Sequence, residues 1–143
     1  MTSIAFHFNA PSKLAYACRL LRKAACGGST VAVLGDEAML AKLDEQLWNF
    51  SALDFVPHGR VQGLSDQQRA DTPIWLCASA DEGQGMQVLV NLTQAVPAGF
   101  EAYTRVIEVV SQDEADRQSA RARWKHYAER SIEIVRHDLN LSS

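Results

Sequence analysis

The sequence predicts an α/β fold: a single Rossmann-like domain over residues 1–143, with a mostly parallel central sheet of about five strands flanked by helices and no nucleotide-binding loop. Three observations support this prediction. The chain begins with alternating strand and helix patterns, which are typical of a parallel sheet covered by helices. Residues 30–34 form a short β-branched run that suits a buried strand. A length of 143 residues with 47% apolar residues suits one domain with its own core.

The first half of the chain alternates regularly between the two patterns. In residues 4–8 an apolar side chain occupies every second position, which is the period of a strand. Residues 11–26 place their apolar side chains at helical spacing, and two glycines follow to end that helix. After the strand at 30–34, Asp36 is placed to cap a second helix. The inward stripe of that helix consists of Leu40, Leu43 and Leu47.

The middle of the chain is less regular. Pro57 interrupts the apolar segment around it, so we expect no long strand there, and residues 59–72 are polar and loop-like. Residues 73–79 and 87–93 each predict a strand. The turn residues at 81–85 allow these two strands to form a hairpin.

The last third of the chain supplies the remaining elements. Residues 97–103 predict a short helix or a loop. The β-branched content of residues 105–110 favours a strand. Residues 113–134 predict the last and longest helix, which would complete the cover of the sheet.

The charge of the chain is unevenly distributed. The net charge is −3, but residues 117–130 contain five basic residues and one acidic residue, a net of +4 that leaves −7 for the rest. A basic stretch on an acidic protein predicts a specific anionic partner and not a general grip on nucleic acid. Direct nucleic-acid binding through the basic helix is thus a disfavoured alternative, and we expect no direct DNA binding.

No targeting or membrane segment is expected. The first ten residues lack the basic and then apolar pattern of a signal peptide. No apolar run approaches the roughly 18 to 20 residues that cross a bilayer. Cys18, Cys26 and Cys77 are odd in number and lie in apolar surroundings, which predicts reduced core cysteines. These observations predict a cytoplasmic protein without a membrane partner.

A search for catalytic or cofactor-binding residues gives no candidate. The first strand-to-helix turn, at residues 9–13, has no glycine that would let a phosphate approach the backbone. The next such turn carries Asp36 and Glu37, whose charges would repel a phosphate. The histidines and cysteines have no metal-binding spacing. We expect no cofactor, no metal and no catalytic residue; the alternative is a small α/β enzyme or nucleotide-binding protein with an unrecognised site.

Two stretches of the chain resemble a known family. Residues 42–48 (KLDEQLW) and 54–58 (DFVPH) form the first, and residues 120–127 (ARARWKHY) form the second. Their order and spacing resemble the chi subunit of DNA polymerase III, a Rossmann-like family without nucleotide binding or known catalysis. The resemblance implies a replication adaptor with two partners. These are the psi subunit, which joins chi to the clamp loader, and the acidic C-terminal tail of single-stranded DNA-binding protein.

The predicted final helix carries the candidate site for that tail. Arg117, Arg121 and Lys125 lie at i, i+4 and i+8 and share a face, and Trp124 lies close to it. An arginine can clamp a terminal carboxylate through two hydrogen bonds. A terminal aromatic side chain can pack on Trp124 and on Val110, at the end of the preceding strand. The resemblance implies roles in tail binding for Arg121 and Val110.

The same helix has a second face with a different expected role. Arg123 and Tyr127 lie at i and i+4 on it, and we expect Tyr127 to pack against the domain with its hydroxyl hydrogen-bonded. Arg123 is a candidate structural residue. For the basic stripe, the alternative to a binding site is a solvated helix face with one amphipathic tryptophan.

A second candidate surface lies near a helix end and an irregular loop. Trp48, Phe55 and Val56 are large apolar residues that, if exposed together, would form a patch requiring a partner. The resemblance implies that Phe55 lies at the interface with psi, and Pro57 and His58 would shape the loop. The alternative is that these side chains close the core beneath the loop, and for Trp48 both interpretations stay open.

Overall fold

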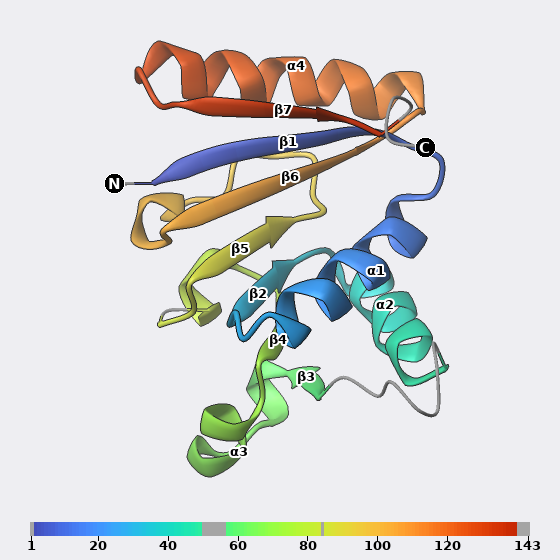
Figure 1. Ribbon diagram of the computed structural model, residues 1–143, viewed down its shortest axis with the longest axis vertical. Coiled ribbons are helices and arrows are strands. Elements are labelled where there is room, and N and C mark those ends of the chain that lie inside the picture. The colour runs from blue at the N-terminus through green and yellow to red at the C-terminus, as the bar shows by residue number, and fades with distance from the viewer. Residues whose placement is uncertain (1, 50–56, 84, 140–143) are drawn as a thin grey trace.

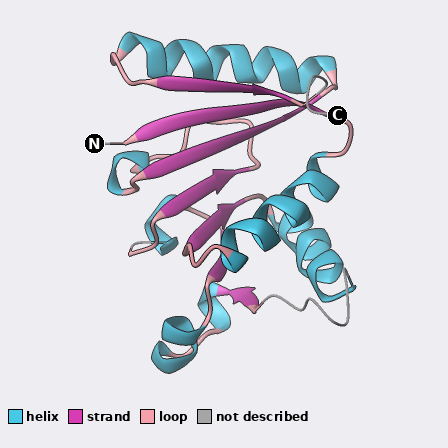
Figure 2. Ribbon diagram, in the orientation of Figure 1, coloured by secondary structure: helices cyan, strands magenta, loops and turns pink. Residues whose placement is uncertain are grey.

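The computed structural model describes residues 2–49, 57–83 and 85–139, which form one sheet with helices on both faces (Figures 1 and 2). The strands are β1 (Ser3–Ala10), β2 (Val31–Leu34), β3 (His58–Arg60), β4 (Ile74–Cys77), β5 (Val88–Asn91), β6 (Arg105–Ser111) and β7 (Ile134–Asp138). All of them pair in parallel, in the order β3-β4-β2-β5-β6-β1-β7. The predicted α/β fold with a mostly parallel sheet is confirmed, with seven strands in place of about five.

The helices cover the two faces of the sheet unequally. The α-helices are α1 (Lys13–Cys26), α2 (Glu37–Asn49), α3 (Asp66–Asp71) and α4 (Glu114–Glu129), and short 3-10 helices span Val61–Gly63, Ala80–Gly83 and Phe100–Ala102. Figure 1 shows α1 and α2 next to each other beside the middle strands, whereas α4 runs alongside β7 at the top edge. Two hydrophobic cores result, one on each face of the sheet.

Strand β2 shows why the sequence forms a sheet buried on both faces. Val31 and Val33 belong to the core under α1 and α2, whereas Ala32 and Leu34 belong to the core on the α4 side. All four residues are buried, which explains the unbroken apolar run in the sequence.

The expected hairpin at residues 73–93 is wrong. β4 and β5 are not neighbours, because β2 lies between them and pairs in parallel with both. The connection from Cys77 to Val88 is long enough to carry the chain past β2, and it contains the 3-10 helix Ala80–Gly83. A two-residue hairpin turn would have forced antiparallel pairing, but this longer crossover does not.

The final helix is shorter than predicted, and a strand follows it. α4 ends at Glu129, and Ser131 adopts a left-handed backbone with φ of 56°. The carbonyl of Tyr127 accepts hydrogen bonds from the backbone of Arg130 and Ile132, which closes the last turn. The chain then returns to pair with β1 as β7, so Ile134 and Val135 belong to a strand and not to the helix.

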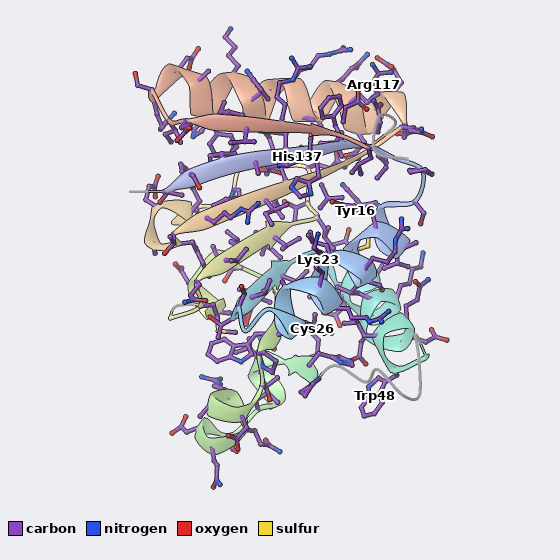
Figure 3. All side chains as sticks on the ribbon, viewed as in Figure 1. Tyr16, Lys23, Cys26, Trp48, Arg117 and His137 are labelled. Atoms are coloured by element: carbon purple, nitrogen blue, oxygen red, sulfur yellow. The ribbon has the colours of Figure 1, made fainter. Side chains whose placement is uncertain are left out.

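The expectation for the cysteines is correct for two of three. Cys18 and Cys77 are buried and unpaired, but Cys26, the last residue of α1, is exposed. Figure 3 shows Cys26 at that helix end. Among the residues that the structure describes, no helix has both the length and the apolar character needed to cross a bilayer.

A buried histidine in β1 makes the stability of the fold depend on pH. His7 is 7% exposed, its Nδ1 lies 2.5 Å from the hydroxyl of Tyr16, and its ring is 4.6 Å from that of His137. Burial, followed by the nearby charges of His137, Arg105 and Lys23, lowers the pKa of His7 to about 4.

We expect the domain to lose stability as the pH falls from 6.5 to 4, because in this window the unfolded chain protonates His7 and the folded chain does not. The contribution is about 2 kcal/mol at most after allowance for solvent screening. Urea unfolding at a series of pH values measures it, with His7→Gln as the comparison. If the two proteins lose stability in parallel over this window, other groups carry the effect.

Candidate functional site

A groove of about 400 Å³ lies between α4 and the edge of the sheet. Four elements contribute to its walls, so it exists only in the folded domain. The groove is lined by Phe6 and Phe8 of β1, Val110 of β6, Arg117, Ala120, Arg121 and Trp124 of α4, and Arg136 of β7.

Aromatic rings form much of the apolar part of the groove. The ring of Trp124 packs on Phe6 with 5.0 Å between the centroids and an angle of 50° between the planes. The guanidinium carbon of Arg136 lies 5.4 Å from the centroid of Phe8 and 5.7 Å from that of Trp124. These are cation–π distances, so the two rings hold the charge of Arg136 over the groove.

The two arginines of α4 are exposed and only loosely paired. Glu114 lies 3.6 Å from Arg117 and 3.8 Å from Arg121, and all three side chains are about half exposed or more. At these distances an exposed ion pair contributes little free energy. Both guanidinium groups can therefore exchange Glu114 for the carboxylate of a ligand.

A buried polar network fixes the helix that carries these arginines. Glu108 of β6 is fully buried and accepts a hydrogen bond from Arg123 Nε at 3.0 Å and one from the hydroxyl of Tyr127 at 2.7 Å. Asn91 of β5 donates to the same carboxylate at 3.0 and 3.1 Å. The expectation that Tyr127 packs inside with a bonded hydroxyl is confirmed.

Burial and hydrogen bonding act in opposite directions on the charge of Glu108. Burial raises the pKa of Glu108, and the positive charge of Arg123 together with the three donors opposes that rise. Arg123 also donates to Ser119 at 2.7 Å, while its Nη2 is buried without a hydrogen-bond partner among the described residues. The buried side chains of Arg123 and Tyr127 thus hold α4 on the sheet, and the side of the helix that carries Arg117, Arg121 and Trp124 lines the groove.

The structure brings together most of the residues predicted for the first site. Val110, Arg117, Arg121 and Trp124 all line the groove. Lys125 is exposed on α4 but is not among the lining residues, because the straight α-helix turns that position away.

The sequence did not predict most of the groove residues that lie on strands. Phe6 and Phe8 fitted the alternation of a core strand, and this pattern carries no signal of a partly open face. Arg136 lies just after the segment predicted as helix, in a strand that was not expected. Parallel pairing of β7 with β1 is what places Arg136 beside the groove.

The second candidate surface lies at the opposite edge of the sheet. Trp48, near the end of α2, is 59% exposed, so it does not close the core. Its ring lies 5.5 Å from that of His58 in β3, and His58 Nε2 is 3.1 Å from Asp44. Pro57 is exposed beside them. Figure 3 shows Arg117 on α4 at the top of the view and Trp48 well below it, at the lower right.

Two residues predicted for this surface, Phe55 and Val56, lie outside the described residues. The exposed ring of Trp48 and the histidine beside it therefore define the described part of the surface. A large exposed tryptophan is a common anchor of protein interfaces.

Open α/β sheets usually bind ligands at the carboxyl ends of their strands. Here side chains of the chain itself connect the carboxyl ends of β1, β5 and β6. Lys13 lies 3.1 Å from Asp116, and both side chains are at most 10% exposed. Asp116 also accepts from the backbone of Ser111 at 2.7 Å and from Gln94 at 2.9 Å. Although burial acts to raise it, the hydrogen bonds from Ser111 and the charge of Lys13 lower the pKa of Asp116. The ion pair fills the space between the N-termini of α1 and α4.

Comparisons with known proteins agree on one family. The family model described as "DNA polymerase III chi subunit, HolC" matches residues 1–135. A relative from Pseudomonas aeruginosa, the DNA polymerase III subunit chi, is 33% identical over 129 residues, covering 90% of this chain and 87% of the relative. The subunit of the same name from Haemophilus influenzae is 35% identical over 92 residues, covering 62% of this chain and 60% of the relative.

A solved structure supports the fold alone. The C-terminal domain of the DEAD-box protein Dbp5 superposes with a TM-score of 0.57 over 98% of this chain and 91% of that one. The identity is 13%, so the likeness concerns the parallel α/β architecture and carries nothing about function.

Proposed function

The chain belongs to the DNA polymerase III chi subunit family, and from this we propose that it is a non-catalytic adaptor of DNA replication. It links the psi subunit, and through psi the clamp loader, to the acidic C-terminal tail of single-stranded DNA-binding protein. It acts in the cytoplasm and needs no cofactor. The observation that carries the proposal is the groove beside α4, where arginines surround an apolar pocket lined by aromatic rings.

The groove suits a peptide that ends in an aromatic residue with a free carboxylate. Its apolar lining, with Val110 and Trp124, accommodates a terminal ring. Arg117 and Arg121 line the groove and make only weak contacts with Glu114. The terminal carboxylate of a peptide can replace Glu114 as their partner. Acidic side chains further along the peptide complement the remaining positive charge.

The surface around Trp48 suits a different partner. An exposed tryptophan that meets His58 edge-on offers an apolar anchor with little charge. We assign psi to this surface, with Pro57 beside it, and the family resemblance implies that Phe55 and Val56 also take part in binding psi. Because it lies at the opposite edge of the sheet from the groove, both partners can bind at once.

Titration of a labelled peptide that copies the tail of the same organism's single-stranded DNA-binding protein tests the first link. We expect saturable binding that weakens as salt rises, measured by peptide anisotropy and by the change in tryptophan fluorescence to which Trp124 in the groove contributes. Arg121→Ala should weaken it about tenfold or more, as should amidation of the terminal carboxylate. The absence of binding at low salt would overturn the groove as the tail site.

Binding of psi can be tested separately from binding of the tail. We expect Trp48→Ala to weaken co-purification with psi by about tenfold or more, because it removes the exposed anchor. Tail binding should stay within about twofold of the unmodified protein, since the groove lies at the far edge. Val135→Ala is the matched control, as Val135 is the other large exposed apolar side chain among the described residues. Equal losses of psi binding in both variants would contradict the assignment.

A further inference from the structure

The groove has two positively charged walls that come from two different elements of the fold, a helix and a strand. Arg117 and Arg121 stand on the wall formed by α4, and Arg136 stands on the wall formed by β7. Figure 1 shows α4 running alongside β7, which is the last strand of the sheet at this edge. The three guanidinium groups are therefore arranged around one cavity and not along one helix face.

The two walls hold their charges in different ways. The helix arginines share the carboxylate of Glu114, at 3.6 and 3.8 Å. Arg136 is held by the faces of Phe8 and Trp124, with its guanidinium carbon 5.4 and 5.7 Å from the two ring centroids. Stacking on rings uses the flat faces of a guanidinium and leaves its N–H edges available for an acceptor. The two rings thus hold the guanidinium of Arg136 beside the groove without using its N–H donors.

The apolar lining separates these charges and suggests how a peptide lies. A terminal ring that packs among Val110, Ala120 and Phe6 has its own carboxylate next to the helix arginines. The rest of the peptide must leave the groove, and a path past β7, the strand at this edge of the sheet, leads away from the helix arginines. Arg136 lies on that side, where residues that precede the terminal one would pass.

We propose that Arg136 binds an acidic side chain upstream of the peptide's terminal residue, whereas Arg121 binds the terminal carboxylate. Arg136 is then a specificity-determining residue that selects acidic tails from among peptides that merely end in an aromatic residue. This inference rests on the proposed function of the groove. It divides recognition into two separable parts, one for the end of the peptide and one for its acidic body.

A double-mutant cycle separates the two parts. The probe is a synthetic peptide that ends in phenylalanine with a free carboxylate and carries two aspartates upstream. Two altered peptides have asparagine in place of both aspartates, or an amidated C-terminus. Each is titrated by anisotropy into the unmodified protein, Arg136→Gln and Arg121→Gln.

We expect Arg136→Gln to bind the parent peptide about fivefold more weakly and to bind the asparagine peptide as the unmodified protein does. Its loss on amidation should equal that of the unmodified protein. Arg121→Gln should behave in the opposite way, with sensitivity to the aspartates retained and sensitivity to amidation lost. The matched control is Arg130→Gln, which removes an equal charge from an exposed arginine bonded to His126 outside the groove; it should stay within about twofold.

The outcomes distinguish this inference from the function on which it rests. If the unmodified protein does not bind the parent peptide, both fail. If it binds and Arg121→Gln weakens binding, but Arg136→Gln does not, only the role of Arg136 is overturned. The same holds if Arg136→Gln abolishes the effect of amidation and leaves that of the aspartates. Thermal unfolding of each variant shows whether a loss reflects folding.

Discussion

Replacing Arg123 with alanine is expected to destabilise the domain by about 3 to 5 kcal/mol. Arg123 is 2% exposed and pairs with Glu108, which is fully buried. Without the guanidinium, Glu108 keeps only the donors Tyr127 and Asn91 and must either carry an uncompensated charge or take up a proton. Urea unfolding, followed by tryptophan fluorescence, measures the loss.

The pH dependence of this loss identifies its cause. Burial already raises the pKa of Glu108, and removal of Arg123 takes away the main opposing charge. When a carboxyl has a higher pKa in the folded protein than in the unfolded chain, the folded protein loses stability as the pH rises above the unfolded pKa, about 4.5 for Glu108. The stability deficit of Arg123→Ala should therefore grow from about pH 5 to pH 8. Arg121→Ala is the control for arginine on the same helix, and because it is exposed it should cost under about 0.5 kcal/mol. A deficit for Arg123→Ala below about 1 kcal/mol would show that the pair is not needed.

Substitution of Gly83 by alanine is expected to destabilise the domain by about 2 to 3 kcal/mol. A Cβ at Gly83 would collide with the hydroxyl oxygen of Tyr103 and with the Cβ of Ala32. Tyr103 is buried and its hydroxyl donates to the carbonyl of Ala80 at 2.6 Å, so it cannot move aside without losing that bond. Ala32 lies in the central strand β2 and has no room to shift.

Gly63→Ala provides the matched comparison. A Cβ there meets nothing within 4 Å, and the residue ends a short 3-10 helix at the surface. The substitution should therefore leave the midpoint of urea unfolding nearly unchanged or raise it slightly, because alanine restricts the unfolded chain. If both variants lose the same stability, the contact of Gly83 with Tyr103 is not the reason for its glycine.

The parts of the fold that the sequence predicted are those in which one period dominates over many residues. The apolar stripe of α2 and the β-branched run of β2 each have one periodicity and one environment. Strand β7 was missed because IVRHD has two apolar residues followed by three polar ones, which shows no strand period. Its pairing with β1 also depends on a partner more than 120 positions away. The hairpin between β4 and β5 was wrong because local turn residues do not reveal which strand lies between.

For the same reason, the sequence predicted the charged and aromatic residues of the groove that lie on α4 but not those on β1 and β7. Arg117, Arg121 and Trp124 belong to one helix, where spacing alone gives the face. Phe8 and Arg136 come from two strands whose neighbourhood is set by the register of the sheet, Phe6 opposite Arg136 and Phe8 opposite Asp138. Such a register follows from tertiary packing, which a single sequence does not display.

The position of the two surfaces at opposite edges of one sheet has a thermodynamic consequence. Between β3 and β1 there are five strand spacings, a span on the order of 24 Å. This is about three Debye lengths at physiological ionic strength, so the acidic charge of one ligand does not reach the other site. The coupling free energy between the two ligands should then be close to zero, and each dissociation constant unchanged by saturation of the other site. The sheet would then act as a spacer that raises the local concentration of one partner near the other. The resulting increase in apparent affinity would come from proximity and not from cooperative binding.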